Sequence, residues 1–293
     1  MPVGRFTSVA MQRRFVLTVT CPDRVGIVAE TAGFLARHDC SIAEAHQHHE
    51  GDGFFMRLAF RAPGDAALDA DTLAAAFAPV AQRFAMDARF HDATVRPRVL
   101  ILVSRFGHCL FDLLHRWRGG QLAVDVAGVV SNHDDLRSFV EWSGVPFHHL
   151  PVTAATKAEQ EAAILDLVGR TGTDLVVLAR YMQILSPALC AALAGRCINI
   201  HHSFLPSFKG ARPYHQARSR GVKIIGATAH YVTTDLDEGP IIEQDVRRVN
   251  HARSADDLVT LGQEVECSVL ARAVQWHIDH RVLLNGQQTI VFD

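Results

Sequence analysis

RVLILV, residues 98–103, is a nearly unbroken apolar run, typical of a strand that is buried on both faces of a parallel sheet. Strand-like and helical stretches alternate after it. The predicted strands are 124–131, 145–150, 174–179 and 198–203, and the predicted helices are 108–117, 134–142 and 157–170. This alternation predicts parallel strands joined by right-handed crossovers. A strand pair at 224–233 and 240–249, joined by a turn at 235–239, and a long helix over 254–280 complete the predicted domain.

The pattern upstream of this domain is different. Four strand-like runs and two helical stretches follow the order βαββαβ, which is typical of a small ferredoxin-like unit. The predicted strands are 14–20, 41–49, 53–60 and 86–91, and the predicted helices are 25–37 and 70–84. The polar segment DATVRP at 92–97 ends in proline and is typical of a linker. The predicted fold class is therefore α/β, with a ferredoxin-like domain over 12–92 and a Rossmann-like domain with a mostly parallel sheet over 97–293.

The composition excludes several classes of function. With 29 basic and 31 acidic residues and a net charge of -2, the chain shows no basic tail, so nucleic acid is not an expected partner. No run approaches the ~18 apolar residues of a membrane span, and residues 1–12 lack the apolar core of a secretory signal. The six cysteines form no C-x-x-C pair and are expected to be reduced thiols. We therefore expect a soluble cytoplasmic protein with no membrane partner.

Three side chains suited to acyl chemistry lie at a predicted strand end and in a predicted loop. Asn199 and His201 alternate in INIHHS, so both should point to one face near the carboxyl end of a strand, where open α/β sheets bind ligands. Asp237 lies in the loop TDLDEGP. An amide can donate to an oxyanion, an imidazole can polarise a carbonyl or move a proton, and a carboxylate can position water. The spacing does not show that Asp237 meets His201, and Asn and Asp are also common turn residues.

Two longer segments carry a family resemblance. INIHHSFLPSFKGARPYHQA, from residue 198, and GVKIIGATAHYVTTDLDEGPIIEQDV, from residue 221, resemble the folate-dependent formyltransferase superfamily. That superfamily has a strand-end Asn-x-His, then Ser-x-Leu-Pro and a Gly, and later an Asp-x-Gly-Pro loop. The resemblance spans about residues 97–293. It implies that Asn199, His201 and Asp237 are the catalytic residues.

The same resemblance predicts a folate pocket. LARYMQIL at 178–185 is similar to the strand and turn that line the pterin pocket in this superfamily. The residues implied to bind folate are Met182, Gln183, Ile184 and Leu185. Packing in the core is the alternative for the apolar members of this set. His230 is expected to line the same cleft, with a purely structural histidine as its alternative.

The loop after the first strand of the second domain bears on the acceptor of the formyl group. Glycinamide ribonucleotide formyltransferases bind their substrate's phosphate there with a Gly-Ser-Asn loop, which offers backbone N–H groups to an anion. This chain has SRFGHCL at 104–110, where His108 and Cys109 replace Ser and Asn, although Arg105 leaves phosphate binding open. Methionyl-tRNA formyltransferases carry an extra C-terminal domain and a basic surface, and the sequence shows neither. Water is therefore the expected acceptor.

Four features are similar to the formyltetrahydrofolate deformylases in particular. They are His201-His202, GARPYHQ at 210–216, His108-Cys109 and the N-terminal unit. In that unit, CPDRVGIV at 21–28 resembles the strand–helix turn of an ACT domain, which often binds amino acids. The resemblance implies an amino-acid effector at Asp23 and Gly26, and a homo-oligomer, because ACT units commonly pair edge strands. A charge that stabilises the helix N-terminus is the alternative role of Asp23.

The implied reaction is hydrolysis of 10-formyltetrahydrofolate to formate and tetrahydrofolate. It would feed formate to purine synthesis and balance the one-carbon folate pool. The folate is the substrate, and no cofactor and no metal are expected. In this scheme Asp237 orients the attacking water and helps to deprotonate it, His201 donates to the formyl oxygen, and Asn199 stabilises the tetrahedral oxyanion.

Three other functions fit parts of the pattern. The same triad could transfer the formyl group to an amine such as glycinamide ribonucleotide. A metallohydrolase could use His201, His202, His215 and His230, but the adjacent strand residues 201 and 202 should point to opposite faces. A non-catalytic amino-acid sensor would leave the complete triad unexplained.

Overall fold

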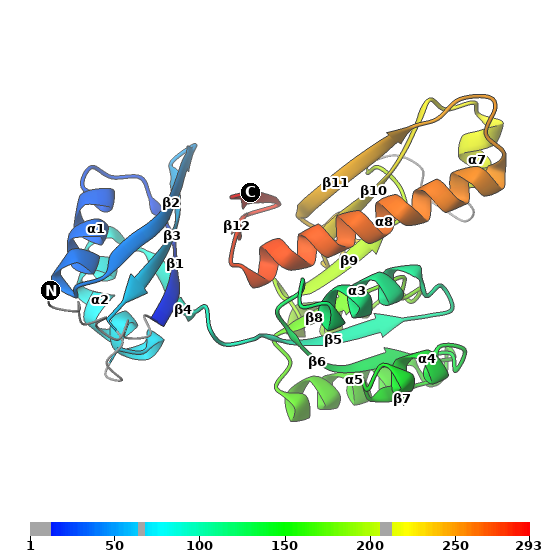
Figure 1. Ribbon diagram of the computed structural model, residues 1–293, viewed down its shortest axis with the longest axis horizontal. Coiled ribbons are helices and arrows are strands. Elements are labelled where there is room, and N and C mark those ends of the chain that lie inside the picture. Colours follow the sequence, from blue (N-terminus) through cyan, green and yellow to red (C-terminus); the bar gives the residue numbers. More distant parts are fainter. Residues whose placement is uncertain (1–12, 64–67, 206–212) are drawn as a thin grey trace, which may run out of the picture. The chain divides into compact units, whose positions relative to one another are not determined.

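The chain divides into two compact units, each with its own sheet (Figure 1). The computed structural model describes residues 13–63, 68–205 and 213–293. The first unit runs to Val95 and also contains residues 279–283 and 290–293. The second unit contains residues 96–278 and 284–289.

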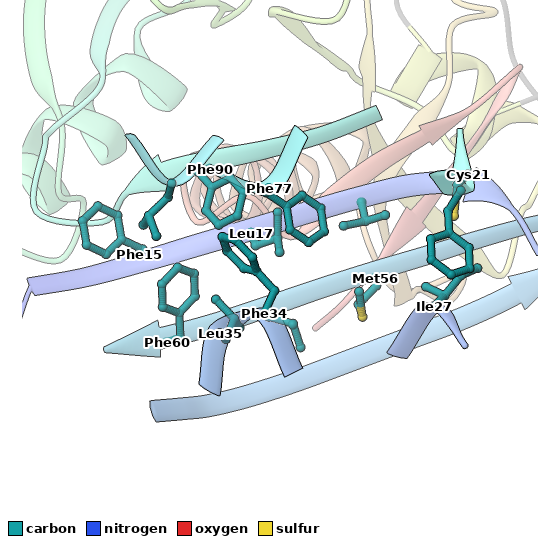
Figure 2. Packing of buried hydrophobic residues seen from close by; sticks show 14 of the residues in the cluster. Phe15, Leu17, Cys21, Ile27, Phe34, Leu35, Met56, Phe60, Phe77 and Phe90 are labelled. Atoms are coloured by element: carbon teal, nitrogen blue, oxygen red, sulfur yellow. The ribbon is translucent and has the colours of Figure 1, made fainter. Parts of the chain in front are cut away.

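The first unit is a four-stranded antiparallel sheet whose core lies between the sheet and two helices. Its elements are β1 (Arg13–Pro22), α1 (Ile27–Arg37), β2 (Ser41–Glu50), β3 (Gly53–Ala62), α2 (Ala70–Phe84) and β4 (Asp87–Asp92). The strand order β2-β3-β1-β4 confirms the predicted βαββαβ arrangement. Figure 2 shows the aromatic core, in which Phe34 of α1 and Phe77 of α2 meet edge to face with ring centroids 4.9 Å apart.

C-terminal residues cover the other face of this sheet. Phe55 and Arg57 alternate along β3 with the residues of the aromatic core, so they point to the opposite side. There Phe55 packs against Leu283 and Phe292, and Arg57 donates from Nε to the carbonyl of Asp279 at 3.1 Å. This packing was not predicted, because no local pattern shows which distant face a C-terminal segment covers. The C-terminal hairpin consists of β12 (Val282–Asn285) and β13 (Gln288–Val291).

The second unit is a seven-stranded sheet in the order β11-β10-β9-β8-β5-β6-β7, flanked by helices (Figure 1). Its elements are β5 (Arg98–Val103), α3 (His108–Arg118), β6 (Asp125–Ser131), α4 (Arg137–Trp142), β7 (Phe147–His149), α5 (Lys157–Thr171), β8 (Leu175–Leu178), α6 (Pro187–Ala192), β9 (Cys197–His201), α7 (Pro213–Ser219), β10 (Ile224–Tyr231), β11 (Ile241–Arg248) and α8 (Ala255–Ile278). Strands β5 to β9 are parallel, and β10 is antiparallel to both of its neighbours. This confirms the predicted α/β fold with a mostly parallel sheet.

The order of the strands places a binding site. RVLILV forms β5 in the interior of the sheet, and its residues Leu100 and Leu102 share a core cluster with Ile164 of α5. From β5 the chain first builds β6 and β7 on one side and then β8 and β9 on the other. The direction of growth therefore reverses between β5 and β8, and open α/β sheets bind ligands beyond the carboxyl ends of the strands at such a point.

Two short helices of the second unit were not predicted. They are α6 and α7, with 6 and 7 residues, which is too short for a clear helical period. The start of α6 still has a local cause, since Ser186 accepts from the Leu189 N–H at 3.3 Å and Pro187 suits the first turn.

Among the helices that the structure describes, none combines the length and the apolar character of a membrane span.

Candidate active site

Strand β9 brings two predicted residues to one edge of the sheet. Asn199 pairs with Leu178 of β8 on one side and with His230 of β10 on the other. His201, two residues further on, is the last residue of β9 and is buried. Both side chains line the same pocket, as expected for residues i and i+2 of a strand.

The loop between β10 and β11 brings Asp237 to the same edge. Its Oδ1 lies 3.2 Å from Nδ1 of His201 and 3.8 Å from Nε2 of His230. Gly239 allows the chain to return this closely, because a Cβ there would lie 1.8 Å from the carbonyl oxygen of Tyr231. The structure therefore brings together the three residues whose contact the spacing could not establish.

Asp237 is ionised at neutral pH. Burial opposes its charge, but the interactions with His201 and His230 outweigh the burial. Together they hold the pKa of the carboxyl well below its usual range. Its backbone adds a sign of constraint, since Asp237 has a φ of 58°, in the left-handed region.

His230 has a defined hydrogen-bond pattern that involves Asn199. Its Nδ1 donates to the backbone carbonyl of Tyr231 at 2.9 Å. In the neutral ring Nε2 is then an acceptor, and it lies 3.2 Å from the amide nitrogen of Asn199. His230 thereby orients the Asn199 amide, whose second N–H can serve a ligand.

One nitrogen of His201 faces Asp237, and the other faces the pocket. This atom, Nε2, is buried and has no hydrogen-bond partner among the residues that the structure describes. Buried polar atoms nearly always have partners, so an unpaired nitrogen in a pocket wall marks a place where a ligand binds.

The pocket at this edge contains every residue predicted for the site of the second unit. Its lining includes the triad, His230 and the turn after β8 with Met182, Gln183, Ile184 and Leu185. Met182 and Ile184 are 52% and 62% exposed, so core packing does not explain them. Leu185 is buried and also belongs to the core cluster beside α5. Exposed apolar side chains at a pocket suit a flat ring system.

The expectation that His201 and His202 point to opposite faces is wrong. Strand β9 ends at His201, so the alternation of faces ends there too. The two rings stack with centroids 5.1 Å apart, and both line the pocket. Burial, and then the charge of Arg180, lower the pKa of His202 to about 4. His202 is therefore neutral at neutral pH.

A buried polar cluster adjoins the pocket, and its centre was not predicted. Glu266 of α8 is 1% exposed, lies 2.7 Å from Nε2 of His108 and accepts from the hydroxyl of Tyr214 at 2.7 Å. Nε of Arg180, a residue of the pocket lining, lies 3.4 Å from the same carboxylate. Burial disfavours the charge of Glu266, but these partners lower its pKa nonetheless. The sequence singles out His108, but nothing in it indicates a partner 158 positions away.

This cluster resembles a metal site in composition but does not fit a cation. His108, Cys109 and Glu266 present ligand atoms within 4.8 Å of one another. However, Arg180 already places a positive charge beside the carboxylate. A hydrogen bond with Cys267, together with burial, raises the pKa of the Cys109 thiol and keeps it protonated.

The two residues predicted to bind an effector lie in the first unit. Gly26 has a φ of 100° and precedes α1, which starts without a side-chain cap. Asp23 is partly exposed, and its carboxylate lies 3.4 Å from Nε2 of His49. Asp23 makes no capping hydrogen bond to α1, and its two expected roles, in effector binding and as a charge near the helix N-terminus, both stay predictions.

Comparisons with known proteins agree with this architecture. Residues 97–274 match the formyl transferase family model, and residues 15–77 match the ACT domain model. The fold and the site thus define an enzyme of the formyltransferase fold that carries an ACT domain. Over 283 residues the chain is 52% identical to the formyltetrahydrofolate deformylase of Corynebacterium sp. (strain P-1), covering 96% of this chain and 98% of that protein.

Solved structures point the same way. The crystal structure of formyltetrahydrofolate deformylase from Burkholderia mallei ATCC 23344 is 53% identical, with a TM-score of 0.91, and covers 96% of this chain and all (100%) of that one. The chain belongs to the formyltetrahydrofolate deformylase family. Glycinamide ribonucleotide transformylase 1 from Symbiobacterium toebii is a more distant relative, 30% identical with a TM-score of 0.64 over 70% of this chain and 97% of that one.

Proposed function

We propose that the protein hydrolyses 10-formyltetrahydrofolate to formate and tetrahydrofolate. The observation that carries this proposal is the likeness to formyltetrahydrofolate deformylases over nearly the whole chain, including the first unit. The pocket supplies matching chemistry, with three polar groups for attack on a carbonyl and the exposed Met182 and Ile184 for the pterin ring.

The geometry favours His201 as the group that moves the proton. A carboxylate with a pKa as low as that of Asp237 is a weak base, so it is poorly suited to deprotonate water. It instead holds Nδ1 of His201 and leaves Nε2 to the pocket. Nε2 then takes a proton from the water whose oxygen bonds to the formyl carbon. It delivers a proton to N10 of the folate as the carbon–nitrogen bond breaks.

Asn199 is suited to stabilise the charge that develops on the formyl oxygen. Its amide is held by His230 at the sheet edge, so little reorganisation is needed when the oxyanion forms. Loss of one such donor typically slows the chemical step by about 10²–10³-fold.

The decisive experiment supplies 10-formyltetrahydrofolate and no amine. We expect formate and tetrahydrofolate to appear in equal amounts. His201→Ala and Asp237→Ala should each slow the reaction by more than about tenfold, whereas the exposed His251→Ala serves as a matched control and should not. Formyl transfer that begins only when an amine is added would support a transferase and contradict hydrolysis.

We also propose that an amino acid regulates the enzyme at the turn that contains Asp23 and Gly26. The match to the ACT domain model and the glycine conformation at this turn support the proposal. Calorimetry with glycine and methionine should show binding that Asp23→Ala weakens. No heat with either amino acid would count against it. We further propose a homo-oligomer, which a single-chain mass in light scattering would exclude.

A further inference from the structure

Three buried side-chain nitrogens lack a hydrogen-bond partner within the described ranges 13–63, 68–205 and 213–293. They are Nε2 of His201 and both Nε and Nη1 of Arg180. The two residues line the same pocket. Unpaired buried polar atoms are rare, so their gathering at one pocket indicates a ligand that both residues contact. Proton transfer from water to N10 accounts for Nε2 of His201, but Arg180 has no part in that transfer.

Arg180 is held in place against its own preferences. It has a φ of 65°, a conformation that costs energy for any residue other than glycine. Its side chain is only 9% exposed, although a guanidinium is strongly hydrated in water. Leu178 of β8 pairs with Asn199 of β9, so Arg180 follows that pair by two residues, as His201 does on the neighbouring segment. The two chain segments therefore carry Arg180 and His201 to the same edge of the sheet.

Glu266 balances the charge of Arg180 without occupying its donors. The carboxylate oxygens have close contacts at 2.7 Å with Tyr214 and His108. Nε of Arg180 lies 3.4 Å away and makes no hydrogen bond with it. The ring of Phe106 lies against the guanidinium, with its centroid 5.5 Å from Cζ. The guanidinium is thus neutralised enough to be buried and still offers N–H groups to an anion.

We propose that Arg180 is a further catalytic residue, whose guanidinium binds the carboxylate that the reaction creates. This inference rests on the proposed function. The substrate's formyl amide is neutral. The oxygen of water bonds to the formyl carbon, the bond to N10 breaks, and N10 gains a proton. The carbon leaves as formate, and one proton is released at neutral pH.

The negative charge on the two oxygens therefore arises only after water has attacked. A cation at this position stabilises the tetrahedral intermediate and formate more than it stabilises the substrate, which is the condition for catalysis. The planar fork of a guanidinium also matches the two oxygens of a carboxylate. The ligand of this subsite is thus a small carboxylate, and formate is the one that the reaction supplies.

The main test replaces Arg180 by glycine, which adopts the positive φ at this position without strain. We expect kcat to fall by about 10²-fold, with little change in KM for the folate. Millimolar guanidinium chloride should restore part of the rate. Both proteins are also titrated with ¹³C-formate, and binding is followed by NMR. The Arg180→Gly variant should bind formate at least about tenfold more weakly than the unsubstituted protein. The exposed Arg253→Gln is the matched control and should change neither quantity.

Formate binding separates this inference from the alternatives. Unchanged formate affinity in Arg180→Gly overturns it even where kcat falls, because Arg180 would then act only through Glu266. If the glycine variant does not fold, Arg180→Lys decides. Lysine keeps the positive charge but lacks the planar fork of the guanidinium. The inference is overturned if the Arg180→Lys variant has the same kcat and the same formate affinity as the unsubstituted protein. A chain that binds ¹³C-formate through Arg180 but releases none from the folate contradicts the proposed function and not the subsite.

Discussion

Replacement of Gly262 by alanine should destabilise the second unit, against the usual trend. Alanine in a helix interior is normally about 1 kcal/mol more favourable than glycine. Gly262 lies inside α8 and is buried. A Cβ there would lie 2.1 Å from Cζ of Tyr214 and 2.2 Å from its hydroxyl oxygen. The glycine is therefore required by the side chain that crosses it.

The magnitude follows from what Tyr214 would lose. Ordinary Cβ contacts start near 3.4 Å, so the buried ring would have to move by more than about an ångström. Such a movement breaks the 2.7 Å hydrogen bond to Glu266. A hydrogen bond to a charged group contributes about 1.5–3 kcal/mol, and overpacking costs about 1–3 kcal/mol. After the gain in helix propensity, the expected loss is about 2–5 kcal/mol in the free energy of unfolding.

The position of the tryptophans provides a selective assay. All 3 tryptophans of the chain, Trp117, Trp142 and Trp276, belong to the second unit. Urea unfolding followed by tryptophan fluorescence therefore reports on the unit that contains α8.

A matched control lies on another helix. Gly169 is inside α5, and a Cβ there would meet no atom within 4 Å. Gly169→Ala should raise stability by up to about 1 kcal/mol. Adding Gly262→Ala to a Tyr214→Ala background should cost little, because the clash is already gone. A Gly262→Ala protein as stable as the unsubstituted one, measured beside a stabilised Gly169→Ala, would refute the reasoning.

Three further predictions address other parts of the molecule. Phe292→Ala should lower the free energy of unfolding of the first unit by about 3–5 kcal/mol, and an unchanged calorimetric transition of that unit would show that the C-terminal residues do not stabilise it. Burial lowers the pKa of His91 from 6.5 to about 4. As the pH drops from about 6.5 to 4, the imidazole therefore takes up a proton in the unfolded chain before it does so in the folded one, and the free energy of unfolding falls. His91→Gln should remove up to about 3 kcal/mol of that loss. The measurement is the urea midpoint of the first unit at neutral and at acid pH. A difference between the two midpoints that is the same with and without the substitution would contradict the prediction. Chelation should leave formate release intact, because Arg180 opposes a cation at His108 and Glu266; a loss that zinc restores would prove this wrong.

The fold could be predicted from the sequence wherever a local pattern decides the structure. RVLILV has no polar face, so it had to lie inside a sheet that is covered on both sides, and it forms β5. The βαββαβ order was equally readable, because both helices of the first unit have a clear amphipathic period. The C-terminal residues gave no such signal. Phe292 ends the apolar run 290–292, and no local pattern shows that it packs against Phe55 of the first sheet.

The site was predictable in its residue types but not in its contacts. Asn199 and His201 share a face because strand geometry requires it. The approach of Asp237 to His201 depends instead on the register of β9 against β10 and on the tight return at Gly239. These are tertiary relations, and no local period encodes them. The same holds for Glu266, a buried acid in a helix whose other buried residues are mostly apolar.

The buried carboxylate also bears on the choice of acceptor. A helix N-terminus ordinarily favours a phosphate, because its free N–H groups point outward. At the start of α3, however, His108 is already engaged with Glu266, which is buried and ionised. The nearest cation, Arg180, is already balanced in charge by this carboxylate, so the helix start offers a phosphate no surplus positive charge from this cluster. The substitution that removes the phosphate-binding loop thus also supplies a partner for a buried carboxylate. A phosphorylated amine is thereby disfavoured, whereas water, which is small and uncharged, needs no such charge.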